Sequence, residues 1–435
     1  MKGAKFTRVL LIVVLLLMVA SIGLGKTKLR VSSWAGADEA ALDEAIIAEF
    51  MRLNPEYEVV FEPVTGGQYY QKILTDIGAG TPPDVILLDA EMIPSFVEGN
   101  YLTDLNPFIS RLSRDGVSGT NLNEYFPVLV DIFRSGRSLY ALPKDTSPIG
   151  IFYNKKVFDE AGISYPPAEG WTMEEFAETA RLLSKDTDGD GKNDVWGFGF
   201  PSWVGVVVPI LWASGGEVFS PDFLQVSGYL NSDLNVETYS FYMDLLSKGY
   251  APTPQEASAL GGAGSLFYTG KVGMIITGRW FNVSVKGQIA RGADLEVGAT
   301  TLPFASMDSK ATVTYASGWA VPAAASDKTG AVKLAAWLSS AYAQTKRCLE
   351  GGLAISAIRS VAEEQGERDE MDSVFISMLE FARVPVGSQT KFYRPKFEST
   401  WAEAFDRINV GGATVKEAMD WAARTMDEYI EKGEY

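Results

Sequence analysis

The sequence predicts an α/β protein built as two lobes. After the first 25 residues, strand-like and helix-like segments alternate along the chain, which is the order of a parallel sheet covered by helices. The chain has 435 residues, which is too many for one ordinary hydrophobic core, so two cores are expected. No long flexible linker divides the chain, which favours lobes between which the chain crosses more than once.

The first segments of this alternation are defined by their apolar patterns and by the residues that end them. Residues 29–33 fit a strand that ends at Trp34. Asp38 is placed to cap a helix whose apolar stripe continues to Leu53, and Asn54-Pro55 ends that helix. The next expected elements are a strand over 58–61, a helix over 69–77 and a short buried strand over 84–88.

Three later segments have equally clear signals. Thr172 and Glu175 form a capping box at the start of a helix. Residues 272–276 read as an apolar strand that runs into Gly278-Arg279-Trp280. Near the end of the chain, one face of a helix is formed by Val415, Met419, Ala422, Met426 and Tyr429.

The composition excludes several classes of function. The formal net charge of −17 repels phosphate backbones and anionic lipid, so no nucleic-acid partner is expected. Histidine is absent, which removes Ser/His/Asp and Cys/His catalysis and imidazole metal ligation. The only cysteine, Cys348, can form neither an internal disulfide nor a thiolate cluster, and we expect it to be a small buried side chain.

The N-terminus has the form of a secretory signal peptide over residues 1–25. Three basic residues precede an uncharged apolar run over 9–20, and Gly23-Leu24-Gly25 suits cleavage before Lys26. The run is shorter than the ~20 residues that span a membrane, although an uncleaved anchor is the alternative. No cysteine lies nearby to carry a lipid. The mature protein is therefore expected in the periplasm or the extracellular space.

Six further motifs follow one another across nearly the whole mature chain. Each alone is a weak signal, and their order and spacing give the set its weight. They are Gly80-Thr81-Pro82-Pro83-Asp84, Tyr140-Ala141-Leu142-Pro143-Lys144-Asp145-Thr146 with Phe152-Tyr153-Asn154-Lys155 close behind, Gly170-Trp171-Thr172, Asp186-Thr187-Asp188-Gly189-Asp190-Gly191 before Trp196-Gly197-Phe198, Gly270-Lys271-Val272-Gly273-Met274, and Ser317-Gly318-Trp319-Ala320-Val321. Together they resemble the sugar-binding family of extracellular solute-binding proteins, the components that deliver ligands to ATP-driven (ABC) importers.

The resemblance implies a fold, a function and partners. The fold would be the two-lobe, periplasmic-binding-protein-like type, with discontinuous domains, a hinge and the ligand in the cleft between the lobes. One lobe is expected over 26–142 and 317–375, and the other over 143–316 and 376–435. The protein would capture a sugar or oligosaccharide for the membrane subunits of an ABC transporter. It would do so as a monomer, without catalysis and without a required cofactor.

A sugar presents apolar C–H faces and hydroxyl groups, so its site should combine aromatic rings with polar side chains, among which carboxylates are the strongest acceptors. Trp280 is the leading candidate, because it follows a strand and a glycine at an expected sheet edge, and the family often stacks sugar at this point. Its neighbour Arg279 could reach a hydroxyl group or form a structural ion pair.

The resemblance adds further candidates. Trp34 and Asp38 lie where the family places hydroxyl-binding groups, and Glu91 aligns with a ligand-binding acid. Leu88 stands where a well-known member of the family has a tryptophan, which argues against a maltose-like subsite. The remaining candidates are Asp145 and Trp319 at the expected crossings, and Tyr69, Tyr70, Trp203 and Tyr393.

Four aspartates resemble the start of a calcium-binding loop. Their spacing supplies ligands at positions one, three, five and nine, with Gly191 at position six. Position twelve is Gly197, so the bidentate glutamate is missing. Calcium and a solvated surface turn are both open, and the turn is favoured. The four residues are Asp186, Asp188, Asp190 and Asp194.

Two rival functions are weaker. A glycosidase needs two carboxylates, and the chain has many, but no catalytic motif stands out. A binder of another small solute, such as glycerol phosphate, would need convergent basic groups or helix N-termini. The candidate cleft positions are mostly acidic or aromatic, with Arg279 as the exception, so a sugar is preferred.

Overall fold

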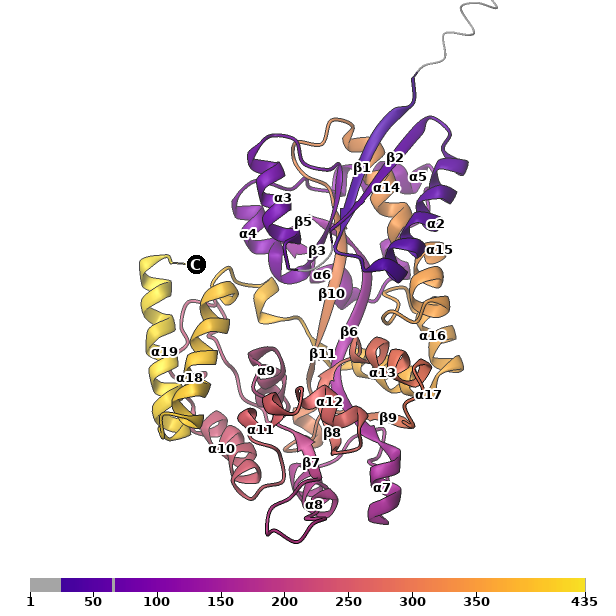
Figure 1. Cartoon of the computed structure of the whole chain (residues 1–435). Coiled ribbons are helices and arrows are strands. Elements are labelled where there is room, and N and C mark those ends of the chain that lie inside the picture. Colours follow the sequence, from indigo (N-terminus) through magenta and orange to yellow (C-terminus); the bar gives the residue numbers. More distant parts are fainter. Residues whose placement is uncertain (1–24, 65–66, 435) are drawn as a thin grey trace, which may run out of the picture.

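The computed structural model describes residues 25–64 and 67–434. The expected signal peptide therefore lies outside the described residues, except for Gly25. Figure 1 shows two α/β lobes joined by two long central strands that run through both. The α/β class and the two-lobe architecture expected from the sequence are confirmed. No helix within the described ranges is long and apolar enough to cross a membrane.

The first lobe is built around a parallel sheet. Its strand β1 (Thr27–Ser33) lies between β2 (Tyr57–Pro63) and β3 (Val85–Asp89) and pairs with both in parallel, as the strand–helix alternation predicts. A short hairpin is formed by β4 (Arg134–Ser135) and β5 (Ser138–Leu139). The helices of this lobe are α2 (Ala37–Leu53), α3 (Tyr69–Gly78), α4 (Ile93–Glu98), α5 (Asn106–Arg114), α6 (Pro127–Asp131), α14 (Lys328–Ser339) and α15 (Ala341–Gln344).

The two lobes share strands β6 (Ala141–Asn154) and β10 (Thr312–Ala320), which run antiparallel to each other through the middle of the molecule (Figure 1). The register shifts between Ser317 and Gly318, because Ser317 faces Asp145 whereas Gly318 faces Pro143. Lys144 is therefore an extra residue in β6, a β-bulge. Bulges often occur next to functional sites because they re-aim side chains.

The second lobe continues the same sheet. Strand β8 (Val272–Gly278) pairs with the second half of β6 and with β7 (Trp196–Gly199), and β9 (Val297–Thr300) pairs with the end of β6. The capping box of Thr172 and Glu175 is present. The helices are α7 (Lys155–Ala161), α8 (Met173–Leu183), α9 (Val204–Ala213), α10 (Asp233–Ser247), α11 (Pro254–Ala259), α12 (Ala263–Tyr268), α13 (Phe281–Ala290), α18 (Glu398–Asn409) and α19 (Val415–Lys432).

The third connection between the lobes lies near Ile355. The backbone of Ile355 exchanges two hydrogen bonds with Thr146, at the point where β6 passes from one lobe to the other. Beyond it come α16 (Arg359–Arg368) and α17 (Glu370–Ser377), and Phe375 of α17 packs against Phe152 in the second lobe. The apolar face of α17 therefore packs against the second lobe, although α17 includes the boundary expected at residue 375.

The N-cap of α2 differs from the sequence prediction, whereas the environment of Cys348 agrees with it. Gly36, and not Asp38, occupies the N-cap of α2, so Asp38 lies in the first helical turn. The side chain of Asp38 is outside the described part of the structure. Cys348 is buried and unbonded to another cysteine, as expected.

Candidate functional site

A cavity of about 390 Å³ lies between the lobes. Trp34, Glu39, Asp89 and Glu91 line it from the first lobe, and Trp203, Trp280 and Val283 line it from the second. The crossing strands and the third connection also line it. The lining residues from these segments are Lys144, Asp145, Ser147, Tyr315, Ala316, Ser317, Leu353 and Ala354, and Arg394 completes the wall.

Three aromatic rings form the second lobe's wall of this cleft. Trp203 precedes α9, Trp280 follows β8, and Tyr315 comes from β10. The ring centroids are 6.3 Å apart for the two tryptophans, 5.8 Å for Trp203 and Tyr315, and 5.8 Å for Trp280 and Tyr315. Trp280 is 37% exposed and Trp203 is 41% exposed. Large apolar surface is therefore left open to a ligand on this side, as the sequence predicts for both tryptophans.

Two glycines allow these tryptophans to lie as they do. A Cβ atom on Gly278 would lie 2.2 Å from the ring of Trp280, and one on Gly205 would lie 2.4 Å from the ring of Trp203. Each ring therefore rests on a backbone that has no side chain. The lack of space for a side chain at Gly278 and Gly205 explains why a glycine lies two residues from each cleft tryptophan in the sequence.

The opposite wall carries acidic groups around one buried lysine. Lys144 Nζ lies 2.8 Å from Glu39 Oε1 and 2.6 Å from Asp145 Oδ2, and Asp145 Oδ1 accepts a hydrogen bond of 2.7 Å from Ser317. Burial alone would lower the pKa of Lys144, but Asp145 and Glu39 raise it above its usual range. The bulge in β6 brings Lys144 and Asp145, which are adjacent in sequence, to the same cavity.

Glu91 is a second acidic group of the cleft, as predicted. It lies in the 3₁₀ helix η1 (Ala90–Met92) after β3, and its Oε2 atom pairs with Arg394 Nη2 at 3.0 Å. Its Oε1 atom is buried and has no hydrogen-bond partner within the described residues. Burial raises the pKa of Glu91 to about 8, against the opposing effect of Arg394. Arg394 also pairs with Glu398, at 3.3 Å.

Trp34, Tyr69 and Tyr70 surround a second cavity of about 380 Å³, which also has Asp89 and Gly67 in its lining. The Tyr70 hydroxyl donates to Asp89 Oδ2 at 3.0 Å and accepts from the Asp89 N–H at 2.9 Å. The Tyr69 hydroxyl is held by the backbone of Ser32 and Leu87. Trp34 lines both cavities, so it is a candidate contact in each, whereas the two tyrosines mainly fix the strand ends and Asp89.

Three predicted site residues lie outside the lining of either cavity. Trp319 is fully buried between β3 and β6, in the first lobe's core. Arg279 is also fully buried, with Nε and Nη2 donating to Asp372 at 2.6 and 2.9 Å, so its structural ion-pair role is the one observed. Tyr393 is 2% exposed and packs against Phe397. The structure therefore does not bring these three side chains into the lining of the cleft.

Sequence reasoning missed several lining residues. Asp89 directly follows the buried run of β3, and a polar residue at the carboxyl end of a parallel strand is a signal that could have found it. Tyr315 and Ser317 lie within a strand that is buried on both faces, so no alternation reveals which side faces the cleft. The cleft cations are Lys144 and Arg394, in place of Arg279.

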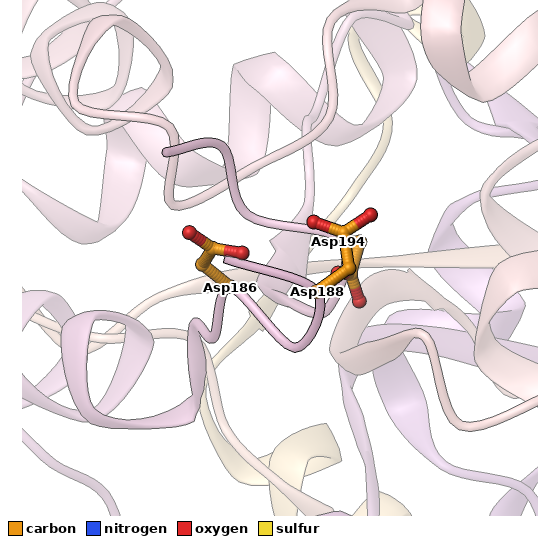
Figure 2. Close-up of side chains that lie close together, drawn as sticks. All are labelled: Asp186, Asp188 and Asp194. Atoms are coloured by element: carbon orange, nitrogen blue, oxygen red, sulfur yellow. The ribbon is translucent and has the colours of Figure 1, made fainter. Parts of the chain in front are cut away.

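The aspartate loop lies on the surface of the second lobe, away from the residues that line the cleft. Figure 2 shows Asp186, Asp188 and Asp194, which can each place one oxygen within 4.8 Å of the others, whereas Asp190 is not part of this group. Asp186 accepts N–H bonds from Gly189 and Gly191. The Gly191 and Gly189 bonds lower the pKa of Asp186, and bonds from Thr187 lower that of Asp194.

Calcium takes six to eight oxygen ligands. This loop offers three grouped carboxylates, and each of them already accepts a hydrogen bond from within the loop. Gly197, at position twelve, has no carboxylate. The loop therefore fits a self-bonded turn better than it fits a complete calcium site.

The fold and the cleft define a class of protein: two α/β lobes that hold a small solute between them. The family of bacterial extracellular solute-binding proteins matches residues 34–345 of this chain. The chain belongs to this family, whose members bind solutes outside the cytoplasm.

Sequence relatives and solved structures agree with this assignment. A maltotriose-binding protein of Pyrococcus abyssi is 24% identical over 266 residues, 61% of this chain and 51% of that protein. This chain matches less than two thirds of the length of the first curated relatives. An ABC substrate-binding protein of Listeria monocytogenes in complex with cycloalternan has a TM-score of 0.77 and 22% identity, covering 94% of this chain and 99% of that one.

A second solved structure has a different ligand. UgpB of Mycobacterium tuberculosis, in complex with glycerophosphocholine, has a TM-score of 0.76 and 20% identity, and covers 94% of this chain and 100% of that chain. At these identities the two structures establish the fold alone.

Proposed function

We propose that this protein captures a sugar or oligosaccharide in the interlobe cleft and delivers it to the membrane subunits of an ABC transporter. The observation that carries this proposal is the pairing of two chemically different walls. Trp203, Trp280 and Tyr315 offer apolar ring faces, and Glu39, Asp89, Glu91 and Asp145 offer acceptors for hydroxyl groups. A sugar has both kinds of surface. The maltotriose-binding relative supports the same ligand class.

The arrangement of the walls supplies the mechanism of capture. A ligand can touch Trp34 and Glu91 of the first lobe together with Trp280 of the second only when the lobes approach each other. It therefore binds the closed form better than the open form and shifts the population toward closure. A transporter that recognises the closed shape would accept loaded protein in preference to empty protein, and no bond needs to be made or broken.

The proposal includes export and the absence of catalysis. Cleavage after Gly25 would release the chain into the periplasm or the extracellular space, where its family acts. A glycosidase would instead leave new reducing ends when the protein is incubated with oligosaccharides. No cofactor is required for a binding function of this kind, and we expect the monomer to be sufficient.

A thermal-shift screen with neutral, amine-bearing and phosphorylated sugars tests the ligand class, because a ligand that binds only the folded state raises the melting temperature. We expect stabilisation by sugars. The second candidate, a glycerol phosphate ester, is suggested by the UgpB likeness. Stabilisation by phosphate esters or peptides, with no response to any sugar in the panel, would replace the sugar proposal.

A further inference from the structure

The charges that line the cleft are unbalanced. Four carboxyl groups stand against two cations, and each cation already has two carboxylate partners. Lys144 lies between Glu39 and Asp145, at 2.8 and 2.6 Å. Arg394 pairs with Glu91 at 3.0 Å and with Glu398, behind the lining, at 3.3 Å. Lys144 is buried between its partners, and Arg394, which is partly exposed, is held by two carboxylates. Among the described lining residues, carboxyl groups therefore outnumber cations two to one.

One carboxyl group of this acidic lining has an oxygen atom without a partner. Glu91 is 7% exposed, and its Oε1 atom has no hydrogen-bond partner among the described residues. Burial raises the pKa of both Glu91 and Asp89, and Arg394 opposes this effect on each. Asp89 raises the pKa of Glu91 further, and Asp145 raises that of Asp89 further. A cationic ligand group beside these two carboxyl groups would favour their ionised form and would be attracted to it.

The aromatic wall faces the same cavity. The rings of Trp203, Trp280 and Tyr315 lie within 5.8 to 6.3 Å of one another and come from three separate segments of the second lobe and the crossing strand. Aromatic faces attract a cation as well as the C–H face of a sugar, and tryptophan does so most strongly. One wall therefore accepts a sugar ring or an ammonium group, and the other supplies negative charge.

We propose that the preferred ligand of this cleft is a saccharide that carries a protonated amine, bound with the ammonium group between the Asp89–Glu91 side and the aromatic wall. This inference rests on the proposed sugar-binding function and narrows it. An amino sugar donates hydrogen bonds through its ammonium group as well as its hydroxyl groups, which suits a cleft that is rich in acceptors. A phosphorylated sugar would meet carboxylates on both sides of each cation.

Matched sugars test the proposal. Thermal shift and then calorimetry would compare each neutral sugar with its amine and its phosphorylated form. The first set is glucose, glucosamine and phosphorylated glucose, and the second is galactose, galactosamine and phosphorylated galactose. A third comparison sets the glucosamine disaccharide of chitosan against its neutral N-acetylated form. In at least one set, the amine should bind at least about tenfold more tightly than its neutral partner, because a unit charge near a partly buried carboxylate is worth more than 1.4 kcal/mol. The preference should weaken as salt is raised.

Two variants and one control assign the effect to the cleft. Glu91→Gln and Asp89→Asn remove carboxyl groups that could ionise beside an ammonium group, with little change in shape, and each should reduce the ratio of amine to neutral affinity severalfold. Glu98→Gln, which removes an exposed carboxylate outside the cavity, should leave the ratio unchanged. Binding of the amine should also release protons from wild-type protein, seen as a dependence of the heat on the buffer, and release fewer from Glu91→Gln.

The outcomes are distinct. Neutral sugars that bind as tightly as their amine partners, or more tightly, would overturn this inference and leave the sugar-binding function in place. Tightest binding by a phosphorylated sugar would overturn it as well. A complete absence of response to every sugar would overturn the proposed function, and this inference with it.

Discussion

Trp280 is the single side chain on which ligand affinity should depend most. The residue is 37% exposed, and its ring lies beside both Trp203 and Tyr315 in the aromatic wall. Replacement by alanine should weaken sugar binding by roughly 2 kcal/mol or more, as central aromatic contacts do. Calorimetry measures this loss, and circular dichroism should show an unchanged fold.

A matched control for Trp280 is Tyr342, an aromatic residue that is 39% exposed, stacks on Trp337 and is not part of the cleft lining. Tyr342→Ala should leave the affinity unchanged. Equal affinities of wild-type protein and Trp280→Ala would reassign Trp280 to packing, and so would loss of the fold.

The buried carboxyl group of Glu91 gives a dependence of stability on pH. The folded protein holds its proton up to about pH 8, whereas the ordinary value is 4.5, so the folded state binds more protons between these values. The stability that this group contributes is therefore complete below about pH 4.5 and is lost as the pH rises toward and through 8. Urea unfolding should show wild-type protein losing stability relative to Glu91→Gln between pH 5 and pH 9, taken as roughly the limits of this window.

The exposed Glu98 provides the comparison for this pH effect, because it pairs with Lys391 at the surface. Glu98→Gln should follow the pH profile of wild-type protein. A constant difference between wild-type protein and Glu91→Gln across the window would show that Glu91 is ionised throughout.

At the scale of elements, the sequence predicts the order of strands and helices in the first lobe. It does not predict which side chains of β10 point into the cleft and which point into the core. The parallel strands β1, β2 and β3 are indicated by short apolar runs and by the turn residues that bound them, and both signals are local in the sequence. The side chain of Trp319 is buried between β3 and β6, and a bulge at Lys144 shifts the register of β6 and β10 between Ser317 and Gly318. A bulge depends on pairing between strands more than 150 residues apart, which the sequence of either strand does not show.

The same limit applies to Arg279. Its partner Asp372 lies 93 residues further along the chain, so the local context of Arg279 beside Trp280 suggested a ligand contact. In the structure, Arg279 Nη1 also donates to the Gly352 carbonyl, and Gln365 joins Asp372 to the Ala354 carbonyl. This network holds the third connection, which includes two residues of the cleft wall, against the second lobe.

Removal of one partner of this network should be costly. Arg279→Ala leaves Asp372 buried and unpaired, which typically destabilises a protein by about 3–5 kcal/mol. Chemical denaturation measures the change. Arg52→Ala breaks an exposed pair with Glu49 and should cost no more than about 1 kcal/mol. Similar losses for the two variants would show that the buried network contributes little to stability.

The aspartate loop before β7 should hold its shape without metal. The carboxylate of Asp186 accepts the Gly189 and Gly191 N–H groups, and Asp194 accepts from Thr187, so the loop supplies its own bonds. We expect the same melting temperature with a chelator and with added calcium. A rise in melting temperature with calcium that Asp186→Ala removes would instead identify a metal site.

At the scale of the whole molecule, three chain segments connect the lobes at one level. Thr146 of β6 bonds to Ile355 of the third connection, and its Oγ1 atom lies 2.5 Å from that of Thr314 in β10. The crossings lie side by side, so we expect rotation about this level to move the lobes as rigid bodies. The candidate contacts Trp34 and Glu91 then approach Trp280, while each lobe keeps its own core.

Saturating sugar should therefore reduce the radius of gyration measured by small-angle X-ray scattering. The ligand gains its full set of contacts only in the closed form, and its difference in affinity for the two forms sets how far the population shifts. Trp280→Ala should blunt the change at the same sugar concentration, whereas Tyr342→Ala should not. The comparison requires protein freed of co-purified ligand. Identical scattering from ligand-free and saturated protein, alongside tight binding by calorimetry, would mean that the lobes do not close and that a transporter cannot distinguish loaded from empty protein by this movement.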